Sequence, residues 1–297
     1  MDKETRMDSY LNTAANSISF KSGRTANKNS DIKIAFKDVS KAYRSGPRDQ
    51  STLALDSLNL NIHDTEIIAV LGPTGCGKSS TLNLIAGFES PCTGAVTLDD
   101  KTILDPGPER AVVFQQPTLF PWLNVLDNVT FGVKNRGVPK DIYEPKALHL
   151  LREVGLADFT KHYPYQLSGG MQQRVQIARA LVSEPKVLLM DEPFGALDAQ
   201  TRILMQELLL QLWSEYKPTI LFITHDVSEA IFIADRVLVM TSRPGRVKLD
   251  IPINEEKPRN TGFLSTRRFM ELQSTLLNAV REEINGAQAQ SYLTAAA

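Results

Sequence analysis

The sequence predicts an α/β fold built round a doubly wound, mostly parallel sheet. Three short apolar runs carry this prediction, because each ends in glycine or a polar cluster as a strand buried on both faces does. They are EIIAVLG (66–72), KVLLMDEP (186–193) and TILFITHD (219–226). The segment 202–216, RILMQELLLQLWSEY, has helical spacing and lies between the last two runs. Strand, helix and strand in this order is typical of such a sheet.

Other segments alternate polar and apolar residues, as half-buried strands do. They are DIKIAFKDVSKAY (31–43) and LALDSLNLNIH (53–63), and TGAVTLDDKTI (93–103) is predicted as a further strand with a turn. We expect a turn over 44–50, a helix over 79–88 and a further buried strand in AVVFQ (111–115). From Gln116 to Gln166 the spacing becomes helical and is broken by Pro and Gly, which indicates a helical insertion.

The two ends of the chain differ from its centre. Residues 1–30 are rich in Ser, Thr, Asn and Lys, which predicts a mobile extension. Near the other end, apolar residues recur every three or four positions through 267–284, namely Phe269, Leu272, Leu276, Val280 and Ile284. This pattern predicts an amphipathic helix. The helix either packs on its own domain or offers a surface to a partner.

Composition narrows the class of protein. The chain has 297 residues, a formal net charge of −1 and a pI of about 6.5, so no basic field favours nucleic acid as a partner. The two cysteines, Cys76 and Cys92, form no metal or disulfide pattern, and a reducing cytosol is the natural location. We find neither an apolar run of about 18 residues nor a signal peptide, so if the chain serves a membrane process we expect other chains to supply the membrane spans.

The segment GPTGCGKSS (72–80) is a phosphate-binding loop. Gly72, Gly77, Lys78 and Ser79 fit the pattern G-x-x-x-x-G-K-[ST] between a predicted strand and a predicted helix. Backbone N–H groups of such a loop surround phosphates, while the Lys78 ammonium reaches the β- and γ-phosphates and the Ser79 hydroxyl binds Mg²⁺. The loop therefore predicts a nucleoside triphosphate site.

Hydrolysis also needs a carboxylate for the metal and a group that activates water. Asp191 and Glu192 follow a buried strand, where sheets of this kind bind ligands. We expect Asp191 to hold Mg²⁺ and Glu192 to polarise the attacking water. His225 ends the next apolar strand and could reach the γ-phosphate, although a lone histidine at a strand end is more often structural.

A second glycine-rich helix start lies at LSGGMQQRVQIARAL (167–181). Ser168 and the N–H groups of Gly169 and Gly170 would stand at a helix N-terminus, which favours anions. The segment is therefore a second candidate anion receptor, and a helix start merely loosened by glycine is the alternative.

Together these motifs resemble the ATP-binding cassette (ABC) family over residues 32–245. The phosphate loop, Gln115 at the end of VVFQ, LSGGMQQ (167–173), VLLMDEP, GALD (195–198) and the histidine of ITHD stand in the family's order. The resemblance implies a P-loop NTPase core with a parallel sheet, an antiparallel β subdomain and an inserted α-helical subdomain. We expect an extension over 1–30, an ATPase domain over 31–245 with the insertion at about 116–178, and a C-terminal extension over 246–297.

The family also implies roles for individual residues. Two cassettes pack head to tail, so each ATP lies between one chain's phosphate loop and the other's 168–170 segment. Tyr43 matches the aromatic that stacks on adenine, although a core tyrosine remains an alternative. The expected catalytic residues are Lys78, Gln115, Glu192 and His225, and the expected Mg²⁺ ligands are Ser79, Gln115 and Asp191. The residues expected to bind nucleotide are Tyr43, Gly72, Pro73, Thr74, Gly75, Cys76, Gly77, Lys78, Ser79, Ser80, Gln115, Ser168, Gly169, Gly170, Gln173, Asp191 and Asp198.

The stretch QPTLFPWLNVLDNVTFGV (116–133) is similar to the subgroup that imports nitrate, sulfonates such as taurine, and bicarbonate. In the family this region receives a cytoplasmic helix of the membrane subunit, so Phe120 and Trp122 either line that groove or belong to the core of the insertion. The implied partners are a second ATPase subunit, identical or paralogous, two permease subunits and an extracytoplasmic binding protein. The implied place is the cytoplasmic face of a bacterial plasma membrane.

Two other functions fit part of the sequence. A soluble ABC ATPase of DNA repair or translation would usually carry two cassettes, long arms or basic surfaces, and none is present. A nucleotide switch that does not hydrolyse would lack Glu192 or His225, and both are present.

Overall fold

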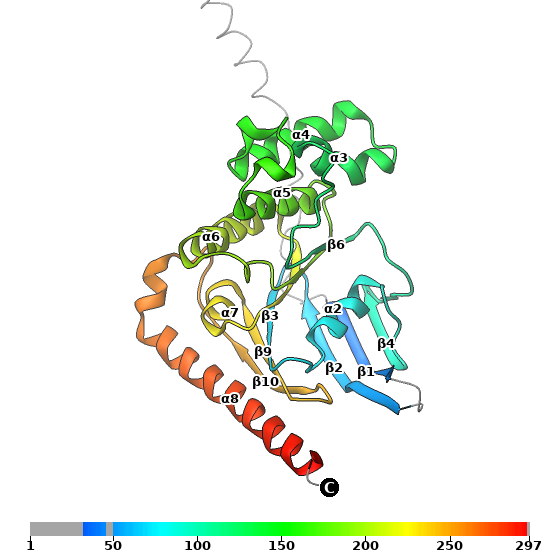
Figure 1. The fold of residues 1–297 in the computed structure, drawn as a ribbon, viewed down its shortest axis with the longest axis vertical. Helices are drawn as coiled ribbons and strands as arrows, with labels where there is room; N and C mark the ends of the chain where they lie inside the picture. The colour runs from blue at the N-terminus through cyan, green and yellow to red at the C-terminus, as the bar shows by residue number, and fades with distance from the viewer. Residues whose placement is uncertain (1–31, 46–49, 296–297) are drawn as a thin grey trace, which may run out of the picture. The chain divides into compact units, whose positions relative to one another are not determined.

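The computed structural model describes residues 32–45 and 50–295. The predicted extension over 1–30 and the centre of the predicted turn over 44–50 lie outside the described residues. Residues 31–297 group as one compact unit. Its strands form a six-stranded sheet and a four-stranded sheet, and Figure 1 shows helix α2 between them.

The six-stranded sheet is the predicted α/β core. Its order is β10-β9-β3-β8-β7-β6, and β9, β3, β8, β7 and β6 run parallel. The bounds are β3 Ile67–Leu71, β6 Arg110–Val113, β7 Val187–Asp191, β8 Thr219–Ile223, β9 Arg236–Met240 and β10 Val247–Pro252. All residues of β3 and β8 are buried, which confirms the prediction of strands covered on both faces.

The predicted buried strand over 111–115 is only partly right. Strand β6 ends at Val113, and Gln115 lies in the segment that follows it. Its residues Arg110, Ala111 and Val112 are only half-buried. The reason is its position, because β6 is the edge strand and pairs only with β7. An apolar sequence alone does not distinguish an edge strand from a central one.

The four-stranded sheet is antiparallel and has the order β2-β1-β4-β5. Its strands are β1 Ile32–Ser45, β2 Gln50–His63, β4 Thr93–Leu98 and β5 Lys101–Thr102. Helix α2 (Lys78–Ala86) shares a core with this sheet and with one face of the larger sheet. The predicted antiparallel subdomain is therefore present, and it forms one wall beside the phosphate loop.

The opposite face of the larger sheet packs on the remaining helices. Alternate residues of β3 point to opposite faces of the sheet. Ile67 and Ala69 belong to the core with these remaining helices, whereas Ile68 and Val70 belong to the core that contains α2. Between β6 and β7 lie α3 (Val125–Asn135), α4 (Lys140–Glu153) and α5 (Gly169–Leu181), with short 3₁₀ turns at Ala157–Phe159 and Pro164–Gln166. Figure 1 shows these helices together as a layer beyond the sheet.

The C-terminal part contains α6 (Ala199–Tyr216), α7 (Val227–Ile233), a 3₁₀ turn (Thr261–Ser265) and the long helix α8 (Arg267–Ala295). Phe269, Leu272 and Leu276 are buried in the same core as α7, so this part of α8 packs on its own chain. Ile284, which belongs to the predicted apolar stripe, is 39% exposed. No helix within the described ranges is both long and apolar enough to span a membrane.

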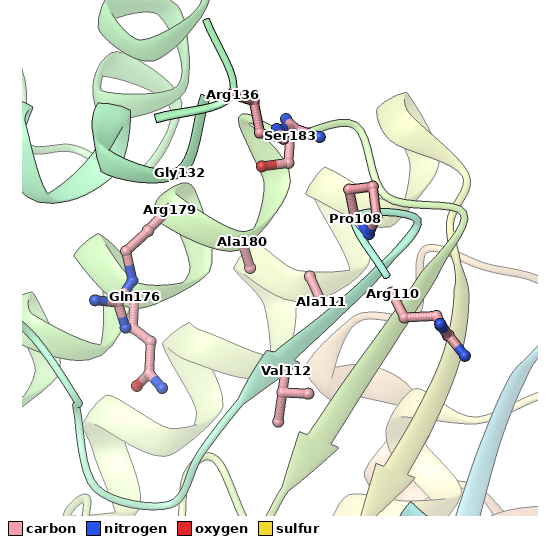
Figure 2. A pocket seen from close by; sticks show the side chains of 10 residues that line it. All are labelled: Pro108, Arg110, Ala111, Val112, Gly132, Arg136, Gln176, Arg179, Ala180 and Ser183. Atoms are coloured by element: carbon pink, nitrogen blue, oxygen red, sulfur yellow. The ribbon is translucent and has the colours of Figure 1, made fainter. Parts of the chain in front are cut away.

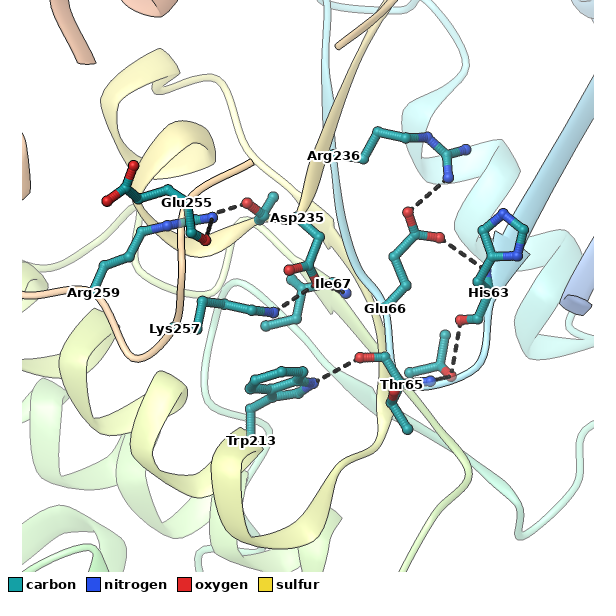
Figure 3. A network of polar contacts seen from close by, with 12 residues as sticks. His63, Thr65, Glu66, Ile67, Trp213, Asp235, Arg236, Glu255, Lys257 and Arg259 are labelled. Carbon is teal, nitrogen blue, oxygen red and sulfur yellow. Dashed lines mark hydrogen bonds and ion pairs between the residues drawn. The ribbon is translucent and has the colours of Figure 1, made fainter. Parts of the chain in front are cut away.

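A polar network fastens the chain between β10 and α8 to the sheet (Figure 3). The Lys257 ammonium lies 2.6 Å from Asp235 and 3.4 Å from the centroid of the Trp213 ring. Burial lowers the pKa of Lys257 to about 8 although Asp235 opposes the shift. Arg259 is buried and donates to the carbonyls of Ile231, Phe232 and Ala234 at the end of α7, where the helix itself supplies no N–H donors. The C-terminal segment therefore completes the end of a core helix.

Candidate functional site

The phosphate loop joins β3 to α2 and curls round the Lys78 ammonium. Gly77 has φ 100, and a β-carbon there would lie 2.6 Å from Leu55, so both its conformation and its packing require glycine. Helix α2 begins at Lys78, whose Nζ donates to the carbonyls of Gly72 (2.7 Å) and Pro73 (3.0 Å). The loop therefore presents a lysine and a helix N-terminus at the carboxyl end of β3, an arrangement suited to phosphate.

Ser79 and Asp191 meet at the same edge of the sheet. The Ser79 hydroxyl lies 3.3 Å from Asp191 Oδ2, although the two residues are 112 positions apart in sequence. Burial raises the pKa of Asp191, while the hydrogen bond from Ser79 lowers it. A hydroxyl beside a partly buried carboxylate is the oxygen donor set that Mg²⁺ prefers. Within 32–45 and 50–295 no group of three or more His, Cys, Asp or Glu could hold a metal ion.

Glu192 and His225 form the next pair. Glu192 Oε2 lies 3.2 Å from His225 Nδ1, and the His225 side chain is 67% exposed. Glu192 has φ 46, an uncommon conformation for a residue with a side chain, and its N–H donates to Ile223 O at 2.9 Å. The backbone thus turns sharply after β7. This turn places the two side chains together at adjacent strand ends.

Buried groups hold the end of β8 from which His225 projects. Thr224 donates to the buried carboxylate of Glu229, and Gln206 donates to the other oxygen of that carboxylate at 3.1 Å. Burial raises the pKa of Glu229. Asp226 caps α7 by accepting from the N–H groups of Ser228 and Glu229. Sequence analysis missed Glu229, and its position in the first turn of α7 gave no signal of this contact.

Gln115 belongs to the same group of side chains. A β-carbon built at Gly195 would lie 3.4 Å from Gln115 Nε2 and 3.8 Å from Glu192 Oε2, so both side chains border the 192–195 turn. The structure therefore brings together Lys78, Ser79, Gln115, Asp191, Glu192 and His225 at the carboxyl ends of parallel strands.

Three further predicted residues, Gln173, Tyr43 and Asp198, make other contacts. Gln173 is 1% exposed, and its amide donates to the carbonyl oxygen of Phe114, the residue before Gln115, at 3.4 Å. The reason is helical spacing, which points Gln173 inward from α5. Tyr43 is half-buried, and its hydroxyl donates to Glu89 at 2.7 Å and lies 3.0 Å from Ser80 Oγ. Asp198 is exposed and caps α6 by accepting from Thr201 N at 3.0 Å.

The 168–170 segment forms the predicted second helix start. Ser168 is the N-cap of α5 and accepts a hydrogen bond from Met171 N at 3.3 Å. Ser168 and Gly169 are exposed, while a β-carbon at Gly170 would lie 3.0 Å from Thr201 at the start of α6. The two anion receptors therefore stand on different elements, one on β3–α2 and the other beside α6.

Comparison with known proteins identifies this arrangement. The ABC transporter family profile matches residues 55–195. An uncharacterized ABC transporter ATP-binding protein of Methanocaldococcus jannaschii is 46% identical over 254 residues, which cover 85% of this chain and 93% of that protein. The chain belongs to the ABC transporter family. ATP-binding chains of this family are ATPases, and this chain is an ATP-binding ATPase subunit.

Other ABC proteins are similar over most of their length. A nitrate import ATP-binding protein of Synechocystis is 47% identical over 72% of this chain and 82% of its own length. A taurine import ATP-binding protein of Yersinia pestis is 49% identical over 69% of this chain and 80% of its own. The dimeric post-hydrolysis structure of the cassette MJ0796 with ADP and Pi is 32% identical, with a TM-score of 0.65, and covers 75% of this chain and 100% of that one. The ABC cassette fold is thereby confirmed.

Proposed function

We propose that the chain is the ATP-hydrolysing subunit of a bacterial importer for a small anion such as nitrate, taurine or another sulfonate, or bicarbonate. It would act at the cytoplasmic face of the plasma membrane with two permease subunits, a second ATPase subunit and an extracytoplasmic binding protein. The nitrate and taurine import proteins, at 47% and 49% identity, support the class of cargo.

In this proposal the residues at the strand ends divide the work of hydrolysis. Lys78 neutralises the β- and γ-phosphates. Ser79, Gln115 and Asp191 would hold Mg²⁺, and the cation would supply charge stabilisation for the phosphate oxygens. Glu192 orients and polarises the water, and His225 contacts the γ-phosphate. The single observation that carries this assignment is the Glu192–His225 contact of 3.2 Å at adjacent strand ends.

The remaining nucleotide contacts would come from the edges of the site. Tyr43 would offer a ring to adenine at the end of β1, beside Ser80 of the phosphate-loop helix. In a head-to-tail dimer, Ser168, Gly169 and Gly170 of the second subunit would close on the γ-phosphate, with Asp198 at the interface. Support comes from the exposed N-terminus of α5, which carries donors suited to an anion, and from the dimeric state of MJ0796.

An aromatic surface on the insertion supports docking to a permease. Trp122 is 70% exposed, and Phe120 packs between the rings of Trp122 and Phe131 at 5.6 and 4.4 Å. Exposed groups of large apolar side chains often mark sites of protein–protein interaction. Because the segment 116–122 begins beside Gln115, movement of a docked helix would reach the hydrolytic group directly.

A cavity of about 290 Å³ adjoins this surface at the junction of β6, α3 and α5 (Figure 2). Arg179 lines it, donates to Thr118 at 2.8 Å and lies over the Phe120 ring at 5.6 Å. Burial lowers the pKa of Arg179, and among the described residues no nearby carboxylate opposes this shift. A permease helix that carries an acidic residue beside an apolar face would match these features.

Docking is tested by expressing the chain with its neighbouring permease genes and purifying the assembly from membranes. Trp122→Ala should lose the permease and keep the ATPase activity of the isolated subunit. Met270→Ala, which removes another apolar side chain that is 57% exposed on α8, is the matched control and should keep the permease. Retention of the permease by Trp122→Ala would remove this surface from the proposal. A chain that copurifies only with ribosomes or DNA would favour a soluble ABC ATPase instead.

A further inference from the structure

The turn between β9 and β10, residues 241–246, packs directly on the phosphate loop. A β-carbon added at Gly245 would overlap the carbonyl oxygen of Cys76, so only glycine allows this approach. Gly245 N donates to Ala54 O at 2.8 Å, and Gly245 O accepts from Asp56 N at 3.2 Å. These two hydrogen bonds hold the turn against β2. The turn is therefore fixed where it meets the loop.

Arg243, in the same turn, reaches the middle of the phosphate loop. Its Nε donates to Gly75 O at 3.4 Å, and a β-carbon at Gly75 would lie 2.9 Å from its Nη2. Gly75 has φ 78, a conformation that glycine adopts freely and equally leaves freely. A loop whose backbone N–H groups must surround phosphates gains from an external contact that keeps such a residue in one conformation.

The turn is held from its other side by the C-terminal helix α8. Glu283 Oε2 accepts from Ser242 N at 2.7 Å, and the Glu283 side chain is 15% exposed. Lys248, on β10, pairs with both Glu283 (2.9 Å) and Glu282 (2.8 Å). Only Glu283 of this acidic pair contacts the turn itself. A chain of contacts thus runs from Glu283 through Ser242 and Arg243 to Gly75.

We propose that Glu283 and Arg243 are positioning residues for the phosphate loop, so that α8 sets the affinity of the ATPase for nucleotide through the β9–β10 turn. Neither side chain contacts the reacting atoms in this proposal. Glu283 fixes Ser242 by a charge-assisted hydrogen bond, and this bond limits the positions of Arg243. The exposed Arg243 then limits the conformations of Gly75. The C-terminal helix acquires a function beyond its own packing.

The test uses the full-length protein and separates KM from kcat. Glu283→Ala should raise KM for ATP roughly three- to tenfold while kcat changes less than about twofold, because a charge-assisted hydrogen bond to the turn is lost and the hydrolytic residues stay in place. Glu283→Gln keeps an acceptor for Ser242 N and should restore most of the affinity. Glu282→Ala is the matched control, since it loses the Lys248 contact without touching Ser242, and its KM should stay at the wild-type value.

Arg243→Ala probes the same contact chain from the exposed end and does not depend on the folding of α8. Arg243→Ala should raise KM for ATP in the same way. The control is Arg246→Ala, on the same turn, which loses an ion pair with Asp56 of β2 and should leave KM unchanged. Thermal unfolding of each variant separates lost affinity from lost stability. Equal KM values for Glu283→Ala and Glu282→Ala, or an unchanged KM in Arg243→Ala, would overturn the proposal.

Discussion

Glu192 Oε2 and His225 Nδ1 lie 3.2 Å apart at the ends of neighbouring parallel strands. The register of those strands explains the contact, because Asp191 pairs with Ile223 and the two chains leave the sheet side by side. Glu192 follows at once in a left-handed conformation, whereas His225 follows after Thr224. A carboxylate and an imidazole are thereby placed where both can face a phosphate bound at the loop after β3.

Replacing Glu192 by Gln tests its assigned role. The variant should bind ATP as the wild type does and form a stable ATP-bound dimer, because shape and hydrogen bonding are kept. Its kcat should fall about 10²- to 10⁴-fold, as expected when a group that activates water is lost. Nucleotide binding and steady-state phosphate release measure the two effects. A rate near that of wild type would exclude Glu192 from this role, and Glu256→Gln on an exposed segment is the control.

A composite site predicts complementation between two inactive variants. Ser168→Arg should abolish hydrolysis and leave nucleotide binding to the monomer intact, because Ser168 stands on α5 and not on the phosphate loop. Lys78→Ala should also abolish hydrolysis, because it removes the lysine of the phosphate loop, which is the other half of the site. Mixed subunits should regain activity, since each heterodimer then holds one intact loop opposite one intact helix start. Phosphate release from the mixture measures this, and a mixture as inactive as its components would contradict a shared site.

The two cysteines should differ sharply in reactivity. Cys76 is fully buried in the phosphate loop, and burial raises the pKa of its thiol, which lowers the fraction of reactive thiolate. Cys92 is exposed. Alkylation followed by mass spectrometry should modify Cys92 first, with Cys76 modified only on unfolding. Equal rates would mean that the loop opens in the native state and that oxidation at Cys76 is open to solvent reagents.

Lys257 gives stability a defined pH dependence. Its folded pKa of about 8 lies below the ordinary value of 10.5, so between these values the unfolded chain holds a proton that the folded chain does not. The free energy of unfolding should therefore rise with pH in this window and lose that contribution as pH falls through about 8. In denaturant unfolding at about pH 7 and about pH 9.5, the free energy of unfolding of wild type relative to that of Lys257→Met should be larger at the higher pH. If the free energy of unfolding of wild type relative to the variant stayed constant or fell between these two pH values, Lys257 would not lose its proton in the folded chain below its ordinary pKa.

Much of this fold could be predicted because the deciding residue patterns lie within a single strand or helix. The strands β3, β7 and β8 were predictable because their burial on both faces leaves an unbroken apolar run. The helices after the two glycine-rich loops were predictable because anion receptors need glycine, serine and lysine at fixed spacing, and the first begins at Lys78, one residue before its predicted start. The length of β6 was mispredicted, because the sequence does not say which strand lies at the sheet edge.

Contacts between distant segments were beyond the sequence. The inward direction of Gln173 depends on how α5 rotates against the segment after β6. Arg243 and Glu283 contact the nucleotide loop and the turn that supports it only because β9 lies next to β3 and α8 passes behind the β9–β10 turn. Neither residue belongs to a motif, so only their place in the fold connects them with the site.

The chain contains two tryptophans in opposite surroundings. Trp122 is 70% exposed, whereas the Trp213 ring is enclosed by the ammonium groups of Lys217 at 3.8 Å and Lys257 at 3.4 Å. Indole emission depends on solvent and on nearby charge, so the intrinsic fluorescence of this chain holds two distinguishable signals. If a membrane subunit covers the insertion as proposed, the Trp122 emission would shift to shorter wavelength, whereas the Trp213 emission would respond if the C-terminal segment releases α6. Transporter assembly and C-terminal release can thus be followed without an attached dye.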